Sequence, residues 1–189
     1  MLALDPGTRQ MGIAVLDGRQ LIYHGVKTLG RHPSPYVWLG EGRRIVLRLL
    51  SDFRPSVLAV EKPFFAQDHN AALLNVLVDE MRSIAAVRGL EVRALAPSTI
   101  RKRVCGDGRA DKRRVAQTVV AKYPDLKVYL GQSRRWQERY HGNMFDAVAV
   151  GLAAETYQTG CVSGSKRIVD RHGATGYRGT MIRSHRRLR

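Results

Sequence analysis

The sequence predicts an α/β fold, built on a mixed five-stranded sheet with helices on both faces. Three apolar or alternating stretches come first, at residues 1–5, 11–17 and 20–28, and short turns containing Gly and Asp separate them. This spacing is typical of an antiparallel meander. The pattern then changes to helix, strand, helix, strand and helices. That order produces crossover connections and parallel strands, so the complete sheet is expected to be mixed.

The first helix is predicted for about residues 40–53. A polar link containing Pro33 and Pro35 precedes it, Pro55 ends it, and the apolar residues 57–60 return as a strand that ends at Glu61. Apolar residues at helical spacing define the side of this helix that we expect to be buried: Ile45, Leu49, Leu50 and Phe53.

A second, longer helix is predicted for about residues 70–88. Its apolar stripe is wider than one packing face requires, so part of it is expected to face another subunit. Residues 90–96 are expected to form the fifth strand and residues 97–104 a short helix. Asp111 is a good N-cap for the helix that follows.

The C-terminal part combines one helix with two segments that are expected to lack regular structure. The polar stretch 129–142 is interpreted as an exposed loop, and the final helix is predicted for about residues 143–157. Residues 159–189 lose periodicity and are rich in Arg, with Asp170 as the only acid. The predicted organisation is therefore one domain over residues 1–158 and a basic, flexible tail.

The charge of the chain favours a polyanionic partner. Its 189 residues include 32 Lys and Arg against 16 Asp and Glu, a formal net charge of +16, which suits nucleic acid. No apolar run approaches the roughly 18 residues of a membrane span, and Cys105 and Cys161 form no zinc motif. We expect neither a membrane partner nor a small-molecule substrate. The expected location is the cytoplasm with the nucleoid, or an organelle if a transit peptide had been removed.

Three acidic residues far apart in the sequence stand at the ends of predicted elements. Asp5 follows an apolar run and opens a Pro-Gly turn, Glu61 ends the strand that begins at residue 57, and Asp146 lies in the first turns of the final predicted helix. Each alone has a commoner explanation, as a turn residue, a surface acid or a helix-start acid. Together, in a basic chain, they suit a divalent-metal site that faces a phosphodiester.

The residues around these acids resemble the RuvC-type Holliday junction resolvases of the RNase H-like superfamily. The resemblance covers about residues 1–157. It rests on four ordered motifs: Asp5-Pro-Gly-Thr, Val60-Glu61-Lys-Pro-Phe-Phe, Gly106-Asp-Gly-Arg-Ala-Asp-Lys112 and Asp146-Ala-Val-Ala. It implies an RNase H-like fold and a homodimer that resolves four-way DNA junctions by paired nicks, in recombination and repair.

The resemblance also implies roles for individual residues. Asp5, Glu61 and Asp146 would bind Mg²⁺, two ions per site with Mn²⁺ able to substitute, and Lys112 would act near the scissile phosphate. Phe64, with Phe65 beside it, matches an aromatic residue that stacks at the junction centre, although a core position is the default for Phe. The expected DNA contacts are Phe64, Phe65, Arg101, Lys102, Arg103, Arg109, Lys112 and Arg113.

The fourth metal ligand is left open. The family usually has Asp or His three residues before the last Asp, where this chain has Asn143, whose oxygen can bind a hard cation without contributing charge. His141 is the weaker alternative, if the helix begins late. Two other functions also stay open: an RNase H-like nuclease of another branched DNA or a structured RNA, and a non-catalytic junction-binding homologue.

Overall fold

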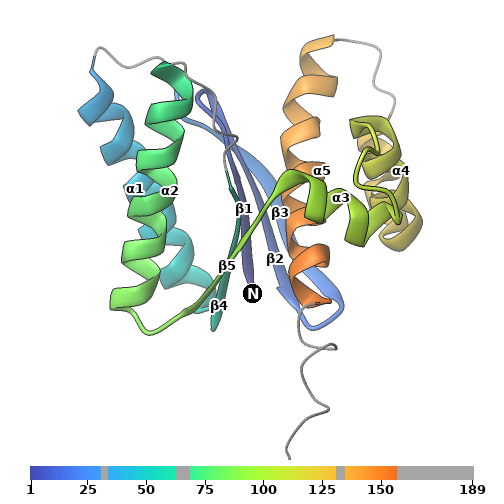
Figure 1. Ribbon diagram of the computed structural model, residues 1–189, viewed down its shortest axis with the longest axis horizontal. Helices are drawn as coiled ribbons and strands as arrows, with labels where there is room; N and C mark the ends of the chain where they lie inside the picture. Colours follow the sequence, from blue (N-terminus) through green and yellow to red (C-terminus); the bar gives the residue numbers. More distant parts are fainter. Residues whose placement is uncertain (31–33, 63–68, 131–134, 157–189) are drawn as a thin grey trace, which may run out of the picture.

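A five-stranded sheet with strand order β3-β2-β1-β4-β5 forms the centre of the molecule (Figure 1). The computed structural model describes residues 1–30, 34–62, 69–130 and 135–156. The first three strands are an antiparallel meander, and the last two add to β1 in parallel. The strands are β1 (Leu2–Pro6), β2 (Gln10–Asp17), β3 (Gln20–Thr28), β4 (Val57–Glu61) and β5 (Glu91–Leu95). The predicted mixed sheet is confirmed.

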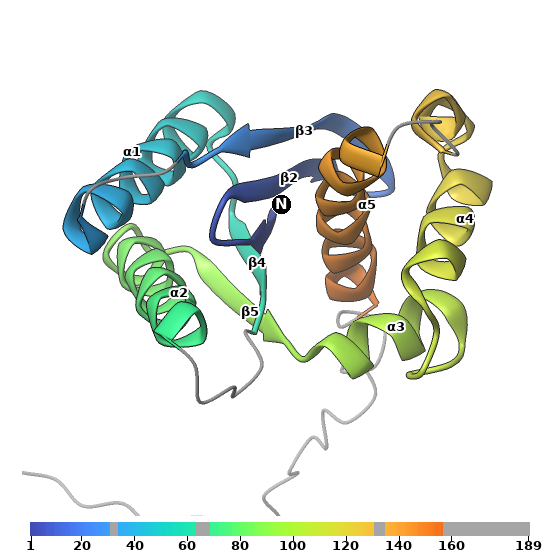
Figure 2. The same cartoon turned by 90° about the horizontal axis from the view of Figure 1, so that it is seen from above.

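Helices cover both faces of this sheet. Viewed from above, α1 and α2 lie on one side and α5 lies on the other, with α3 and α4 outside α5 (Figure 2). A short 3-10 helix, η1, lies between α4 and α5 in the sequence. The helices are α1 (Pro35–Phe53), α2 (His69–Val87), α3 (Pro97–Cys105), α4 (Lys112–Lys122), η1 (Pro124–Tyr129) and α5 (Arg135–Glu155).

Strand alternation decides which side chains meet α5. Leu2 and Leu4 pack into the core beneath α1 and α2, whereas Ala3 between them packs beneath α5. Successive side chains of a strand point to opposite faces, so Asp5 lies on the α5 face. The same argument applies to β4, where Ala59 packs beneath α5 and Glu61 is two residues further along.

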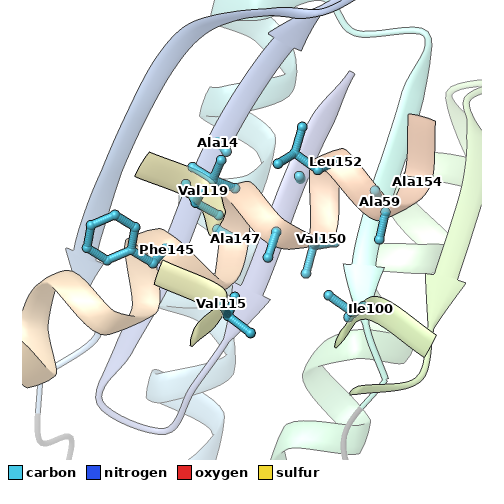
Figure 3. Close-up of a cluster of buried hydrophobic side chains, with 14 of the residues drawn as sticks. Ala14, Ala59, Ile100, Val115, Val119, Phe145, Ala147, Val150, Leu152 and Ala154 are labelled. Carbon is cyan, nitrogen blue, oxygen red and sulfur yellow. The ribbon is translucent and has the colours of Figure 1, made fainter. Parts of the chain in front are cut away.

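Small residues allow α5 to approach the sheet closely. Ala14 and Ala59 line the sheet face beneath it, and α5 contributes Ala147 and Val150, while Val115 of α4 closes the cluster from outside (Figure 3). At Gly12 the approach is closest, because a Cβ atom there would overlap the carbonyl oxygen of Asn143. The middle of α5 is therefore held directly against β2.

Both ends of α5 are tied to other elements. Near its beginning, the hydroxyl of Tyr140 donates to the carbonyl oxygen of Val26 in β3, at 3.1 Å. Near its end, the buried guanidinium of Arg93 donates to the carbonyl of Ala154 at 2.9 Å, and Arg103 donates to the preceding carbonyl at 3.0 Å. The two arginine bonds satisfy carbonyls that the end of a helix leaves without partners.

Helix α1 begins earlier than the sequence pattern suggested. Ser34 is its N-cap, since its hydroxyl accepts a hydrogen bond from the amide of Tyr36, and Pro35 occupies the first turn. The extra turns bring Trp38 into the core. The side of the helix predicted to be buried does face the core: Leu49 and Leu50 are buried, and Ile45 and Phe53 are partly buried against it. The buried residues of α1 are Trp38, Gly42, Val46, Leu49 and Leu50.

The prediction of an exposed loop over residues 129–142 was also wrong. Tyr129 is the last residue of η1, and α5 already begins at Arg135. Aromatic packing explains the ordered structure, because the ring of Tyr129 lies against those of His24 and His141. Asp146 is therefore about three turns inside the helix, and the interpretation as a helix-start acid does not apply.

Some predictions fall outside the described residues. Phe64, Phe65 and the proposed tail 159–189 are among them. Among the helices that the structure describes, none has the length and apolar character needed to cross a membrane.

Candidate active site

The three acidic residues meet in one open cavity of about 220 Å³. Leu4 of β1 pairs with Val60 of the adjacent parallel strand β4, and Asp5 and Glu61 each follow that pair by one position. Helix α5 brings Asp146 over the same edge of the sheet. The residues that line the cavity are Asp5, Pro6, Gly7, Glu61, Pro97, Ile100, Arg101, Lys112, Val115, Asn143, Asp146 and Ala149.

Burial and neighbouring negative charge raise the pKa of two of the carboxylates, Asp5 and Glu61. Burial, followed by the charges of Asp146 and Glu61, raises the pKa of Asp5 well above its ordinary value. Burial and the charge of Asp146 raise the pKa of Glu61 to about 7, although the cations of Lys112 and Arg101 oppose this. Ionised carboxylates in a partly buried cavity repel one another, and a bound cation would relieve that repulsion.

Lys112 partly neutralises this negative charge. It is the first residue of α4, where Asp111 caps the helix by accepting a hydrogen bond from the amide of Arg114 at 2.7 Å. Its Nζ donates to Oδ2 of Asp146 at 2.7 Å. Partial burial lowers the pKa of Lys112, but the carboxylates of Asp146, Asp5 and Glu61 more than offset this, so the pKa is raised overall.

Asn143 lies in the cavity and His141 does not. Asn143 is one helical turn before Asp146 and lines the same cavity. Its Nδ2 donates to Oε1 of Gln10 at 3.0 Å. The ring of His141 instead packs between those of Tyr129 and Tyr140, at centroid distances of 4.8 and 5.3 Å. Because α5 begins early, the late helix start on which a His141 ligand depended does not occur.

The donor set fits a hard divalent cation. Carboxylate and amide oxygens are the ligands that Mg²⁺ and Ca²⁺ prefer. Within the described residues, however, no three Asp, Glu, His or Cys side chains form a complete metal site as they stand. One carboxylate oxygen of Asp146 is paired with the ammonium of Lys112, at 2.7 Å. Asp5, Glu61 and Asp146 nonetheless share one cavity, and the charge of Asp146 contributes to the raised pKa values of Asp5 and Glu61, which is the stronger indication of a common site.

The residues expected to contact DNA occupy different positions. Arg101 of α3 lines the cavity. Lys102, Arg109 and Arg113 are exposed around it on α3, the following loop and α4. Arg103 is directed to the backbone of α5, as described above, which leaves it less suited to a phosphate contact.

Gln10 is a site residue that the sequence interpretation missed. It begins β2 and shares its sheet face with Gly12 and Ala14, because side chains alternate along a strand. The available signal was that alternation, combined with the position of Gln10 five residues after Asp5 across the Pro-Gly turn. Its partner Asn143 is 133 residues away in the sequence, so the contact is visible only in the folded chain.

The sequence matches a known protein family over residues 1–128. The family model of the crossover junction endodeoxyribonuclease RuvC matches residues 1–128. The RuvC of Idiomarina loihiensis is 33% identical over 130 residues, which are 64% of this chain and 73% of that protein. The RuvC of Rubrobacter xylanophilus is 35% identical over 132 residues, covering 64% of this chain and 70% of the relative.

Solved structures show the same fold. Thermus thermophilus RuvC superposes with a TM-score of 0.64 at 24% identity, over 84% of this chain and 95% of that one. The yeast mitochondrial Holliday junction resolvase gives a TM-score of 0.65 at 14% identity, over 84% of this chain and 78% of that one. The predicted RNase H-like fold is thereby confirmed. On the family match and the curated relatives, this chain belongs to the RuvC family of crossover junction endodeoxyribonucleases, which are divalent-metal-dependent nucleases.

Proposed function

We propose that this protein resolves four-way DNA junctions by metal-dependent cleavage of phosphodiester bonds, in homologous recombination and repair. The observation that carries the proposal is the cavity that Asp5, Glu61 and Asp146 share beside Lys112. Family membership supports the proposal. The fold is also similar to that of T. thermophilus RuvC, which has been solved in complex with a Holliday junction substrate. That structure superposes with a TM-score of 0.65 at 23% identity, over 84% of this chain and 94% of that one. The proposed location is the cytoplasm, at the nucleoid, where DNA undergoing recombination would be bound.

Asp5, Glu61, Asp146 and Asn143 are the residues that would hold Mg²⁺, with two ions per site and Mn²⁺ as a substitute. When bound, such ions supply an activated water and neutralise charge on the attacking and leaving oxygens. Lys112 has a separate role. Its ammonium is paired with Asp146 in the free protein, and a phosphate entering the cavity offers it a second anionic partner. Arg101 lies in the cavity wall, where its guanidinium suits a phosphate oxygen.

The active form is proposed to be a homodimer. A four-way junction has two equivalent strands to cut, and a two-fold enzyme places one active site at each. Helix α2 lies on the outer side of the sheet, beside α1 (Figure 2). Two of its valines, Val76 and Val87, are exposed, whereas Leu77, Val78, Met81, Ile84 and Ala85 are buried in the core. This exposed side of α2 is the proposed dimer interface.

Cleavage of a mobile four-way junction in Mg²⁺, compared with a matched duplex and a flap of the same sequence, tests the function. We expect paired nicks in the junction, little cutting of the duplex, and none with Asp5→Asn. Faster cutting of the flap or of structured RNA would indicate another substrate. Tight junction binding without cleavage by the wild type would indicate a non-catalytic homologue.

A further inference from the structure

We propose that Gln10 is a positioning residue of the metal site, which orients the amide of Asn143 so that its oxygen is available to the cation. The inference rests on the proposed metal-binding function of the cavity. It concerns a residue outside the cavity wall, and it explains how a neutral amide can serve at a position where a carboxylate or imidazole would otherwise bind.

The strand places Gln10 where this contact is possible. Gln10, Gly12 and Ala14 lie on the same face of β2, beneath α5. The missing side chain of Gly12 lets the backbone of Asn143 lie directly against the strand. The next side chain on that face, Gln10, then meets the side chain of Asn143, and Nδ2 of Asn143 donates to Oε1 of Gln10 at 3.0 Å.

The chemistry of the amide makes this contact consequential. An Asn side chain has one acceptor end and one donor end, and only the oxygen can bind a cation. With Nδ2 donating to Gln10, the oxygen is the end left for another partner. If the amide of Asn143 turned over, its NH₂ group would face the cavity. The oxygen that could bind the cation would then be replaced by the positive end of the amide dipole. An Asp at this position would need no such partner, because both of its oxygens accept.

A purely structural role makes a different prediction. If the contact only joined β2 to α5, its loss would lower the stability of the protein and leave metal affinity unchanged. Both side chains are partly accessible, so replacing Gln10 leaves no buried polar group without water. The two roles can therefore be separated by measuring metal binding and thermal unfolding on the same variants.

The experiment measures Mn²⁺ affinity of the DNA-free protein by electron paramagnetic resonance of the free ion. Gln10→Met keeps the length of the side chain and removes the acceptor. We expect it to weaken Mn²⁺ binding about two- to tenfold, the range of one hydrogen bond's net contribution. Gln10→Glu keeps the acceptor and should bind at least as tightly as wild type. Gln20→Met, at the exposed start of β3, is the matched control and should not change affinity.

A double-mutant cycle shows whether Gln10 acts by orienting the amide of Asn143 or has a general effect on Mn²⁺ affinity. In the Asn143→Asp background both oxygens accept, so Gln10→Met should have no effect on Mn²⁺ affinity. Unchanged affinity of Gln10→Met in the wild-type background, or an equal loss in both backgrounds, would overturn the inference. If Gln10→Met does not fold, Gln10→Ala takes its place in the cycle.

These outcomes are separable from those of the proposed function, because no DNA is present in the titration. If the Mn²⁺ affinity depends on Gln10 but the protein cuts flaps in preference to junctions, the inference about Gln10 stands and the proposed junction specificity is refuted. If the protein cuts junctions but the double-mutant cycle shows no coupling, the proposed function stands and the inference about Gln10 is refuted.

Discussion

Replacing Glu61 with Gln is expected to stabilise the metal-free protein while abolishing its cleavage activity. The pKa of Glu61 is raised from 4.5 to about 7, which means that the folded state holds this proton more tightly than the unfolded state. The free energy of unfolding therefore falls as the pH rises from about 4.5 to about 7. The displaced pKa corresponds to a loss of about 3 kcal/mol once the carboxylate is ionised in both states.

A neutral Gln of similar shape has no such dependence. We expect Glu61→Gln to be more stable than wild type by about 2–3 kcal/mol at about pH 8, and by less than about 1 kcal/mol at about pH 5. Urea unfolding in the presence of a chelator at the two pH values measures this difference. Added Mg²⁺ should then raise the stability of the wild type more than that of the variant, because the variant lacks one ligand.

Glu91 offers a control of opposite sign. Its hydrogen bond from Arg93 lowers the pKa of Glu91, so this carboxylate contributes stability above its ordinary pKa and loses it as the pH falls. Glu91→Gln should therefore be less stable than wild type at about pH 8. If Glu61→Gln gains the same stability at both pH values, or is less stable than wild type at the higher one, then burial and the charge of Asp146 do not raise the pKa of Glu61 as inferred.

Four further outcomes are expected. Lys112→Ala should slow single-turnover junction cleavage about 10²–10³-fold while Mn²⁺ affinity does not fall, since the variant frees a carboxylate; loss of Mn²⁺ binding would contradict this. Gly12→Ala should lose about 1–3 kcal/mol in urea unfolding, because its new Cβ meets the backbone of α5, whereas Gly40→Ala, which has open space around it, should lose none. Deleting residues 161–189 should make the slope of log affinity against log salt concentration shallower, by about 0.9 for each phosphate that is no longer neutralised. The position of the cut should not change. An unaltered slope would mean that this segment does not bind DNA. Phe64→Ala should have a melting temperature within a few degrees of wild type, whereas replacing a buried Phe by Ala costs about 3–5 kcal/mol of stability. The variant should cut a fully paired junction slowly, and it should cut a junction with unpaired bases at its centre faster.

Much of the site was predictable from the sequence because strand ends are easy to recognise. Asp5 and Glu61 each follow an apolar run, and the parallel pairing of β1 with β4 is what brings them together. The start of α1 was placed too late, although Ser34 followed by Pro35 is a common beginning of a helix and was a signal present in the sequence.

The remainder depended on contacts between distant segments. Residues 135–142 are polar and carry no helical apolar stripe, and it is the packing of Tyr129, His141 and Tyr140 that supports them as helix. The partnership of Gln10 with Asn143 requires both the face of β2 and the depth at which α5 lies, and neither follows from local sequence. Tertiary packing overrides local propensity in residues 135–142, and it creates the contact between Gln10 and Asn143.

The attachment of α5 at both ends has a consequence for how the site binds its ion. A hydrogen bond to β3 holds the helix on one side of Asn143 and Asp146, and arginine contacts from β5 and α3 hold it on the other. The ordering entropy of bringing these two side chains to the sheet is thus spent during folding, not during metal capture. Reorganisation on binding then includes Lys112, which has to rotate away from one oxygen of Asp146. The backbone that carries the two α5 ligands is fixed before the ion binds, whereas the counter-ion of Asp146 has to move.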